Sequence, residues 1–256
     1  MNKFILIILF TSINLFSSTI IYTSSYIDVL SGKIIKNSSI TINNNKISSI
    51  DKGYINVSKY DNLIDLRGLT VMPGLMDMHV HFGGEYQSKA ERPVKVERET
   101  EAILATAHAY TTLKAGFTTV RQVGDSGLVA ISLRDAIKNG FVIGPRIFTS
   151  GKSIATTGGH ADPTNGKAID DYEYPTPEDG VINGPYEAFT AVRQRYKDGA
   201  DGIKLTVTGG VLSVAKSGDN PQFTEEEVDA VVKAAKDYGM WVAVHAHGSE
   251  GMKRAV

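Results

Sequence analysis

Hydrophobic and polar positions follow two different rhythms along the chain, and the change falls near Pro73. Between residues 20 and 70, short apolar runs alternate with polar turns, and the spacing typical of helices is absent. The segments 38–42 and 46–50 flank three asparagines, a pattern typical of a β-hairpin. We therefore predict a small β subdomain over residues 20–72.

After Pro73 the pattern alternates between strands and helices. Strand-like apolar runs lie at 75–81, 117–120, 146–150, 202–207 and 241–245. Helix-like segments lie between them, at 97–114, 128–139, 186–197 and 224–238. The last of these begins with TEEE, a capping-type start, and a segment rich in glycine and proline spans 151–185. Strands that alternate with helices favour a parallel α/β sheet over residues 73–256.

The number of strands leaves two architectures open. A closed (β/α)8 barrel needs eight strands and about 250 residues, whereas residues 73–256 supply only the five strand-like runs. The pattern therefore fits either an open sheet or the first part of a longer barrel. The closing residues GSEGMKRAV have the pattern of a helix that is cut off midway, and both architectures stay open at this point.

The first residues differ in kind from the rest. They read MNKFILIILFTSINLFSS, with Lys3 before an apolar run through Phe16 and small polar residues after it, as in a secretory signal peptide. The run is short for a spanning helix, which needs about 20 apolar residues, although an uncleaved anchor stays open. We assign residues 1–19 to a signal peptide and expect an exported protein, periplasmic or secreted. Contact with a membrane is expected only through this segment.

Composition narrows the chemistry by exclusion. The formal net charge is -1, with neither a basic patch nor an acidic block, so a nucleic-acid partner is not expected. The chain has no cysteine, which excludes disulfides and thiolate metal sites. Any metal must therefore be held by histidine, by a carboxylate or by a less usual ligand. Composition gives no indication of the oligomeric state.

The strand-like run that follows Pro73 carries polar residues at every second position. Residues i, i+2 and i+4 of a strand share a face, so Asp77, His79 and His81 are expected to point the same way. Two imidazoles at this spacing can hold one metal ion from a rigid support. The alternative is a pair of core histidines satisfied by hydrogen bonds. In the metal interpretation, Asp77 orients one of the histidine ligands.

A lysine interrupts the apolar run GIKLTV. Lys204 shares a strand face with Thr206, and a parallel strand is normally covered on both faces. An ammonium group buried there is costly unless it is paired, neutralised or modified. A neutral lysine can react with carbon dioxide to give a carbamate, whose two oxygens can bridge two metal ions. The alternative is a lysine at a strand end that reaches water.

The ends of three strands carry the candidate ligands. His245 ends the strand at 241–245, and His81, Lys204 and His245 all fit the edge at which α/β barrels place functional residues. Separate strands that bring nitrogen and oxygen ligands to one rim favour a site for two divalent ions, foremost zinc, although manganese, cobalt and iron also suit such ligands. Arg121 and Asp125 reach the same rim, either as loop-ordering ion pairs or as substrate contacts.

Five segments together resemble the amidohydrolase superfamily, in particular its imidazolonepropionase-like branch with dipeptidases that release C-terminal Pro, Arg or Lys. These segments are VMPGLMDMHVHF (71–82), GFTTVRQVGDSG (116–127), GPRIFTSGKSIATTGGHAD (144–162), DGIKLTVTGG (201–210) and VAVHAHGSEGMKRA (242–255). The resemblance covers residues 25–256. It implies a (β/α)8 barrel of the TIM type beside an N-terminal β-sandwich, with residues 73–256 supplying strands 1–5 and the remainder missing.

The same resemblance assigns roles to residues. It implies that His79 and His81 bind the more buried ion, that Lys204 is the carboxylated bridge, and that His245 binds the second ion. It further implies that His160 and His247 bind the substrate, at its α-carboxylate. The alternative is that both are ordinary loop histidines with local hydrogen bonds. The aspartate that acts as general base follows strand 8 in the family and is expected beyond Val256, so we identify no catalytic residue in this chain.

The function implied is that of a metal-dependent amidohydrolase. A hydroxide that bridges the two metal ions would attack a peptide or amide carbonyl of a small substrate, as in a metallodipeptidase. Two alternatives stay open. One is a hydrolase of cyclic amides, as in imidazolone cleavage. The other is a non-catalytic metal-binding fragment that keeps the ligands and lacks the base.

Overall fold

The computed structural model describes residues 18–59, 61–83, 97–125, 127–211, 213–214 and 217–256. They belong to two compact units that divide between Pro73 and Gly74. The predicted signal peptide falls almost entirely on residues 1–17, which lie outside the described residues. Within the described part of the chain, no helix combines the length and apolar character that a membrane crossing requires.

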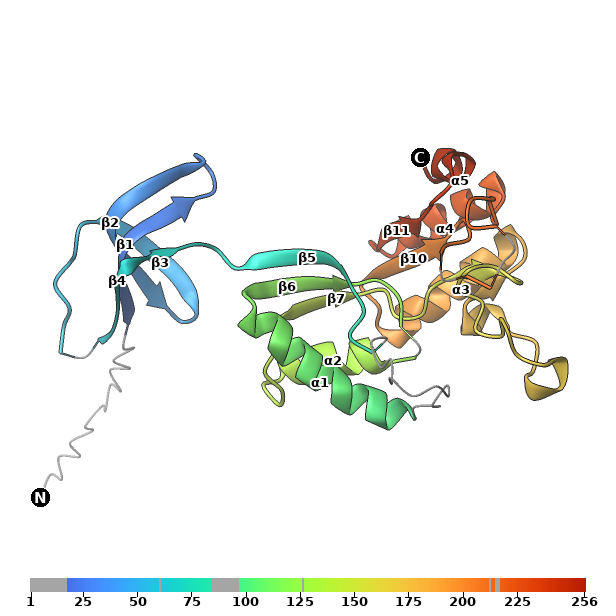
Figure 1. Ribbon diagram of the computed structural model, residues 1–256, viewed down its shortest axis with the longest axis horizontal. Helices are drawn as coiled ribbons and strands as arrows, with labels where there is room; N and C mark the ends of the chain where they lie inside the picture. The colour runs from blue at the N-terminus through green and yellow to red at the C-terminus, as the bar shows by residue number, and fades with distance from the viewer. Residues whose placement is uncertain (1–17, 60, 84–96, 126, 212, 215–216) are drawn as a thin grey trace, which may run out of the picture. The chain divides into compact units, whose positions relative to one another are not determined.

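The first unit contains one mixed sheet with the strand order β3-β2-β1-β4 (Figure 1). Its strands are β1 (Thr19–Asp28), β2 (Lys33–Asn43), β3 (Lys46–Lys52) and β4 (Asn62–Val71). The predicted hairpin is confirmed, because β2 and β3 pair antiparallel from Asn43 and Lys46. Asn44 and Asn45 form its turn with positive φ, which asparagine tolerates better than most residues. β1 begins at Thr19, the last residue assigned to the signal peptide.

A second layer is needed to make this sheet a sandwich. β1 pairs antiparallel with β2 and parallel with β4, and all four strands belong to the one sheet. The described residues of this unit supply no second sheet to pack against it, so the β-sandwich stays a prediction.

The second unit is built on parallel strands. β5 (Leu75–Val80), β6 (Phe117–Gln122) and β7 (Arg146–Thr149) form one parallel sheet, and β10 (Gly202–Thr206) pairs in parallel with β11 (Trp241–His245). These match the five predicted strands. A short parallel pair, β8 (Ala155–Thr156) and β9 (Val181–Ile182), lies in the segment that was predicted to be loop. The unit is mixed α/β as predicted, and closure into a full barrel stays a prediction.

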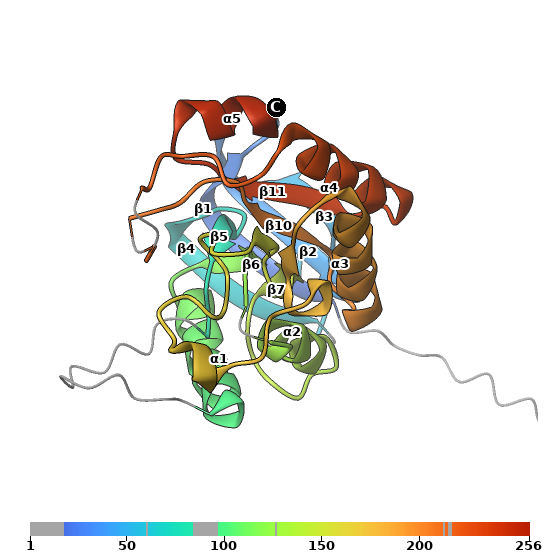
Figure 2. The same cartoon turned by 90° about the vertical axis from the view of Figure 1, so that its right-hand side faces the viewer.

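Helices pack against one face of these strands (Figure 2). They are α1 (Arg98–Lys114), α2 (Val129–Lys138), α3 (Pro185–Asp198), α4 (Glu225–Asp237) and α5 (Ser249–Ala255), with short 3-10 turns η1 (Ile169–Asp171) and η2 (Pro177–Asp179). One apolar cluster lies between α1, α2 and the sheet of β5, β6 and β7. A second lies between α3, α4 and β10. Ile203 and Leu205 are fully buried in the second cluster, so Lys204 and Thr206 take the opposite face of β10.

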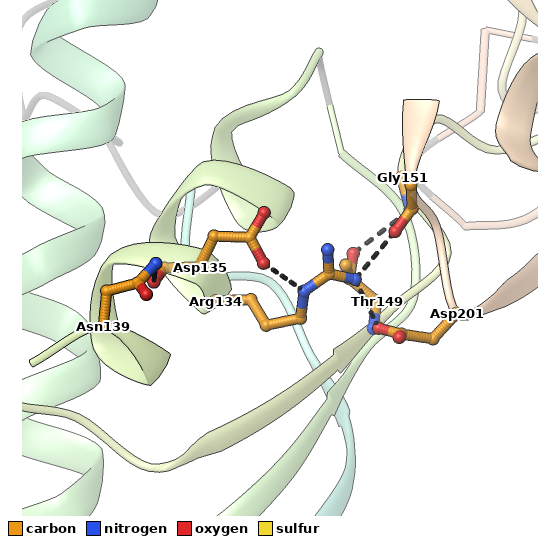
Figure 3. Close-up of polar contacts among 7 residues, drawn as sticks. Arg134, Asp135, Asn139, Thr149, Gly151 and Asp201 are labelled. Atoms are coloured by element: carbon orange, nitrogen blue, oxygen red, sulfur yellow. Dashed lines mark hydrogen bonds and ion pairs between the residues drawn. The ribbon is translucent and has the colours of Figure 1, made fainter. Parts of the chain in front are cut away.

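A polar network fixes the start of β10 against the end of β7 (Figure 3). The backbone N–H of Asp201 donates to the Thr149 carbonyl at 2.7 Å, and the Thr149 N–H donates to the Asp201 carboxylate at 2.8 Å. Arg134 of α2 donates to the same carboxylate oxygen and to the Gly199 carbonyl, both at 2.8 Å. A slip of one residue would turn Lys204 toward the helices. The network therefore sets the face on which Lys204 lies.

The predicted capped start of α4 is confirmed and is open to a direct test. The Thr224 hydroxyl accepts a hydrogen bond from the Glu227 N–H at 3.2 Å, and the Thr224 N–H donates to the Glu227 carboxylate at 2.8 Å. Because Thr224→Ala leaves a helix donor unpaired, it should lower the free energy of unfolding by about 1 kcal/mol. Urea denaturation measures this loss. Thr224→Ser should retain most of the stability, and an alanine variant as stable as the parent would contradict the capping role.

Candidate functional site

A cavity of about 320 Å³ opens where the parallel strands of the second unit end. It brings together five of the residues predicted from the sequence, namely His79, His81, His160, Lys204 and His245. They come from β5 and the residue after it, from the segment after β8, from β10 and from the end of β11. Side chains that are distant in the sequence thus share one polar pocket at the strand ends, as expected for a site of this class.

His79 of β5 and His81, the residue that follows its end, direct their rings toward one another. Their Nε2 atoms are 3.0 Å apart, which is also the distance of a hydrogen bond between the two rings. A zinc ion lies about 2.0–2.1 Å from each histidine nitrogen, so two nitrogens at angles between square and tetrahedral are separated by about 2.9–3.4 Å. The pair therefore fits a single ion. Burial lowers the pKa of His79, and the nearby Lys204 and His81 lower it further, which favours the neutral imidazole that binds metal.

Lys204 lies inside the protein with a solvent exposure of 6%. Burial lowers the pKa of its ammonium group, and the positive charge of Arg121 adds to this effect. Among the described residues, no carboxylate pairs with it and no hydrogen bond is found for its side chain. A lowered pKa favours the neutral amine, the form that reacts with carbon dioxide. The environment thus fits a modified lysine better than a free ammonium.

His245 approaches the same pocket from the end of β11. Its ring stacks on that of His160 with centroids 4.6 Å apart, and its Nε2 lies 2.7 Å from the Gly209 carbonyl oxygen. A Cβ atom at Gly210 would lie 3.0 Å from His245 Nε2, so only glycine lets this loop pass the two rings. The bond to the Gly209 carbonyl holds the ring in one orientation and leaves the other ring nitrogen, Nδ1, as the atom with which His245 could bind a metal ion.

The geometry of the described residues separates strong from weak candidates. Within them, no three His, Cys, Asp or Glu side chains stand close enough together to hold an ion. The donor set that fits is the pair of His79 and His81 with Lys204, whose carbamate oxygens would add the anionic ligand. His245 lines the same cavity, with its Nε2 bound to the Gly209 carbonyl.

The loop that carries His160 is held by its own polar contacts. The His160 N–H donates to the side-chain oxygen of Gln222 at 2.8 Å. Buried Asp162 accepts the Gly158 N–H at 2.7 Å and both the N–H and the hydroxyl of Thr164. Burial, then the charges of His245 and Lys204, lower the pKa of His160. Its imidazole is therefore a neutral hydrogen-bonding group in the pocket.

Two predicted residues do not line this pocket. Asp77 accepts a hydrogen bond from the backbone N–H of His79 at 3.0 Å, so its contact orients the strand rather than an imidazole ring. The His247 side chain is 57% exposed, and its Nε2 lies 4.0 Å from the Asp219 carboxylate. The roles predicted for both in ligand orientation and substrate binding stay predictions.

Gln122 of β6 was not assigned to the site from the sequence, and its neighbour Arg121 was placed at the rim with a different contact. Gln122 is 2% exposed, accepts the Phe82 N–H at 2.9 Å and donates to the Gly124 carbonyl at 3.1 Å, which ties the residue after His81 to the loop after β6. The position of Gln122 at the end of a strand was the feature of the sequence that could have indicated its place at the site. Arg121 donates from Nε to the Met78 carbonyl at 2.9 Å, a contact that is neither of the two expected for it.

Comparison with known proteins identifies relatives. Residues 70–256 match the model of the amidohydrolase family. The chain is 73% identical to a Xaa-Pro dipeptidase crystallised with methionine in its active site, with a TM-score of 0.90 over 93% of this chain and 59% of that one. A prolidase complexed with N-methylphosphonate-L-proline is 30% identical, with a TM-score of 0.79 over 93% of this chain and 58% of that one.

A curated relative extends the comparison to a fungal protein. Ochratoxinase of Aspergillus niger is 27% identical over 93% of this chain and 52% of its own length. A crystal structure of A. niger ochratoxinase matches with a TM-score of 0.77. The chain thus spans about half the length of the curated relative that it matches.

Proposed function

This chain belongs to the amidohydrolase family. We propose that it functions in metal-dependent hydrolysis of amide bonds, with a small dipeptide that ends in Pro, Arg or Lys as the substrate. The observation that carries the proposal is the convergence of His79, His81 and the buried Lys204 on one cavity. The likeness to a Xaa-Pro dipeptidase and to a prolidase bound to a proline analogue supports the C-terminal proline in particular.

The ligands proposed for two divalent ions follow from the donor set. His79 and His81 would hold the first ion, Lys204 as its carbamate would supply an oxygen to each ion, and His245 would hold the second through Nδ1 while its Nε2 keeps the bond to Gly209. Such ions, when bound, polarise a carbonyl group and lower the pKa of water. Asp77 keeps His79 in place by accepting its backbone N–H.

The remaining residues of the pocket recognise the substrate. His160 is fixed through its backbone by Gln222, and its neutral imidazole donates a hydrogen bond to the α-carboxylate of the dipeptide. The cavity of about 320 Å³ lies at the small end of the range of ligand pockets, about 300–1,000 Å³. This size favours a dipeptide over a longer peptide.

Hydrolysis of a dipeptide panel tests the proposal. The zinc-loaded protein should release the C-terminal residue from Xaa-Pro, Xaa-Arg or Xaa-Lys dipeptides, as measured by chromatography of the free amino acids. A chelator should abolish the release and added zinc should restore it.

Matched substrates separate the alternatives. Cleavage of a hydantoin or an imidazolone without cleavage of any dipeptide would favour the cyclic-amide hydrolase. Zinc binding without hydrolysis of either class would contradict an enzymatic role and favour the non-catalytic metal-binding protein.

A further inference from the structure

Arg121 is the last residue but one of β6 and reaches across to two other strands. Its Nε donates to the Met78 carbonyl of β5 at 2.9 Å. Its guanidinium carbon lies 5.1 Å from the ring centroid of Trp241, the first residue of β11. One cationic side chain thus contacts the strand that carries His79 and the strand that ends at His245.

The contact on β5 falls at an irregularity in the sheet. Asp77 pairs with Val120 and Val80 pairs with Gln122, so two residues of β5 stand opposite Arg121 alone. This is a β-bulge, a feature that bends a strand and re-aims side chains and is frequent beside functional sites. Met78 and His79 are the two residues of the bulge, and neither has a partner in the β5–β6 register.

At both bulge residues, hydrogen bonds to side chains take the place of the backbone hydrogen bonds between β5 and β6. The Met78 carbonyl accepts from Arg121, and the His79 N–H donates to the Asp77 carboxylate at 3.0 Å. A bulge whose polar groups are bound in this way has one defined shape. That shape places Nε2 of His79 at 3.0 Å from Nε2 of His81.

Trp241 provides the surface on which the guanidinium rests. Its ring takes the place that a side chain at Gly202 would occupy, because a Cβ atom there would lie 2.1 Å from the ring. Gly202 shares a strand face with Lys204, so the indole lies on the same side of β10 as the cavity. A planar guanidinium stacks on such a ring while its Nε stays directed at a carbonyl, which the ammonium of lysine cannot do.

We propose that Arg121 is a positioning residue, which holds the bulge of β5 and so sets the separation of the His79 and His81 imidazoles. The effect on metal binding rests on the proposed function, whereas the positioning of the rings does not. The expected effect is that the zinc affinity of the pair depends on a residue that is not itself a ligand. Partners of this kind typically change metal affinity by about 10–100-fold when they are removed.

The test uses the full chain in its metal-free form with Arg121→Met and Arg121→Lys. Arg146→Met is the matched control, because Arg146 lies in the same sheet and donates to Thr119 without touching β5. Zinc affinity is measured by competition with a chromophoric chelator. Arg121→Met should bind zinc about 10–100-fold more weakly, and the control should bind it as the parent does. Arg121→Lys should stay weaker than the parent, because it restores the charge without the planar contact.

Two spectroscopic measurements report on position without metal. In long-range proton–nitrogen spectra of the six histidines, the resonances of His79 and His81 should move in Arg121→Met while those of His108 and His160 stay in place. Emission from Trp241, the single tryptophan, should change in the same variant. If Arg121→Met does not fold, Arg121→Lys is measured in the same way.

The outcomes separate this proposal from the proposed function. Unmoved His79 and His81 resonances with parental zinc affinity would overturn the positioning role and leave a metal site in place. Parental affinity in Arg121→Lys would also overturn it, since charge alone would then suffice. A parent chain that binds no zinc, combined with moved resonances in the variant, would overturn the metal site and support the positioning of the imidazoles.

Discussion

Replacement of Lys204 by alanine is expected to remove the second metal ion and to reduce dipeptide hydrolysis by more than about a hundredfold. Loss of an outer partner of a metal ligand already costs about 10–100-fold, and Lys204 is proposed as a ligand itself. Its side chain is buried on the cavity face of β10, and among the described residues it forms no ion pair with a carboxylate. The metal-to-protein ratio after dialysis, measured by elemental analysis, gives the first readout.

A matched variant and a chemical rescue sharpen this test. Thr206→Val changes the next residue on the same buried face and should keep both ions, because the hydrogen bond that the Thr206 hydroxyl makes among the described residues goes to the Ile154 carbonyl. Added formate or acetate should partly restore the second ion in Lys204→Ala, since a small carboxylate offers the two oxygens that the carbamate supplied. An alanine variant with the parental metal content would rule out the bridging role.

The sequence pattern predicted the second unit well because its elements are long and periodic. The strand–helix alternation after Pro73 matches β5, β6, β7, β10 and β11 and the helices between them. The pair of β8 and β9 was not predicted because strands of two residues carry no periodicity. Because the two strands are parallel, their pairing depends on a crossover connection through residues 157–180, which local propensity does not describe.

The candidate site was predicted where strand alternation alone decides the direction of a side chain. Lys204 and Thr206 lie opposite Ile203 and Leu205, as a period of two requires. The bulge at Met78 and His79 was not visible, because its residues fit the same alternation as a regular strand. His247 follows the end of β11, where no periodicity fixes the side chain, and it points to Asp219 instead of the cavity.

Replacement of Asp201 by alanine is expected to lower the free energy of unfolding by about 2–4 kcal/mol. The change removes the acceptor of the Thr149 N–H and leaves Arg134 without its carboxylate partner between α2 and β10 (Figure 3). Asp201→Asn keeps an oxygen for Thr149 and should lose less. Urea denaturation of both variants measures the difference.

Asp135 supplies the control that this prediction needs. It pairs with the same Arg134 at 2.9 Å, but its side chain is 50% exposed and its contact joins neighbours on one helix. Asp135→Ala should therefore cost at most about 0.5 kcal/mol. Equal losses for the two alanine variants would mean that Asp201 acts as an ordinary surface charge. We expect Asp201→Ala to cost more stability than Asp135→Ala, and this extra cost should disappear when Asp201→Ala is made in an Arg134→Ala background. That result would show that the network joins β7 to β10. That junction fixes the register on which the cavity face of Lys204 depends.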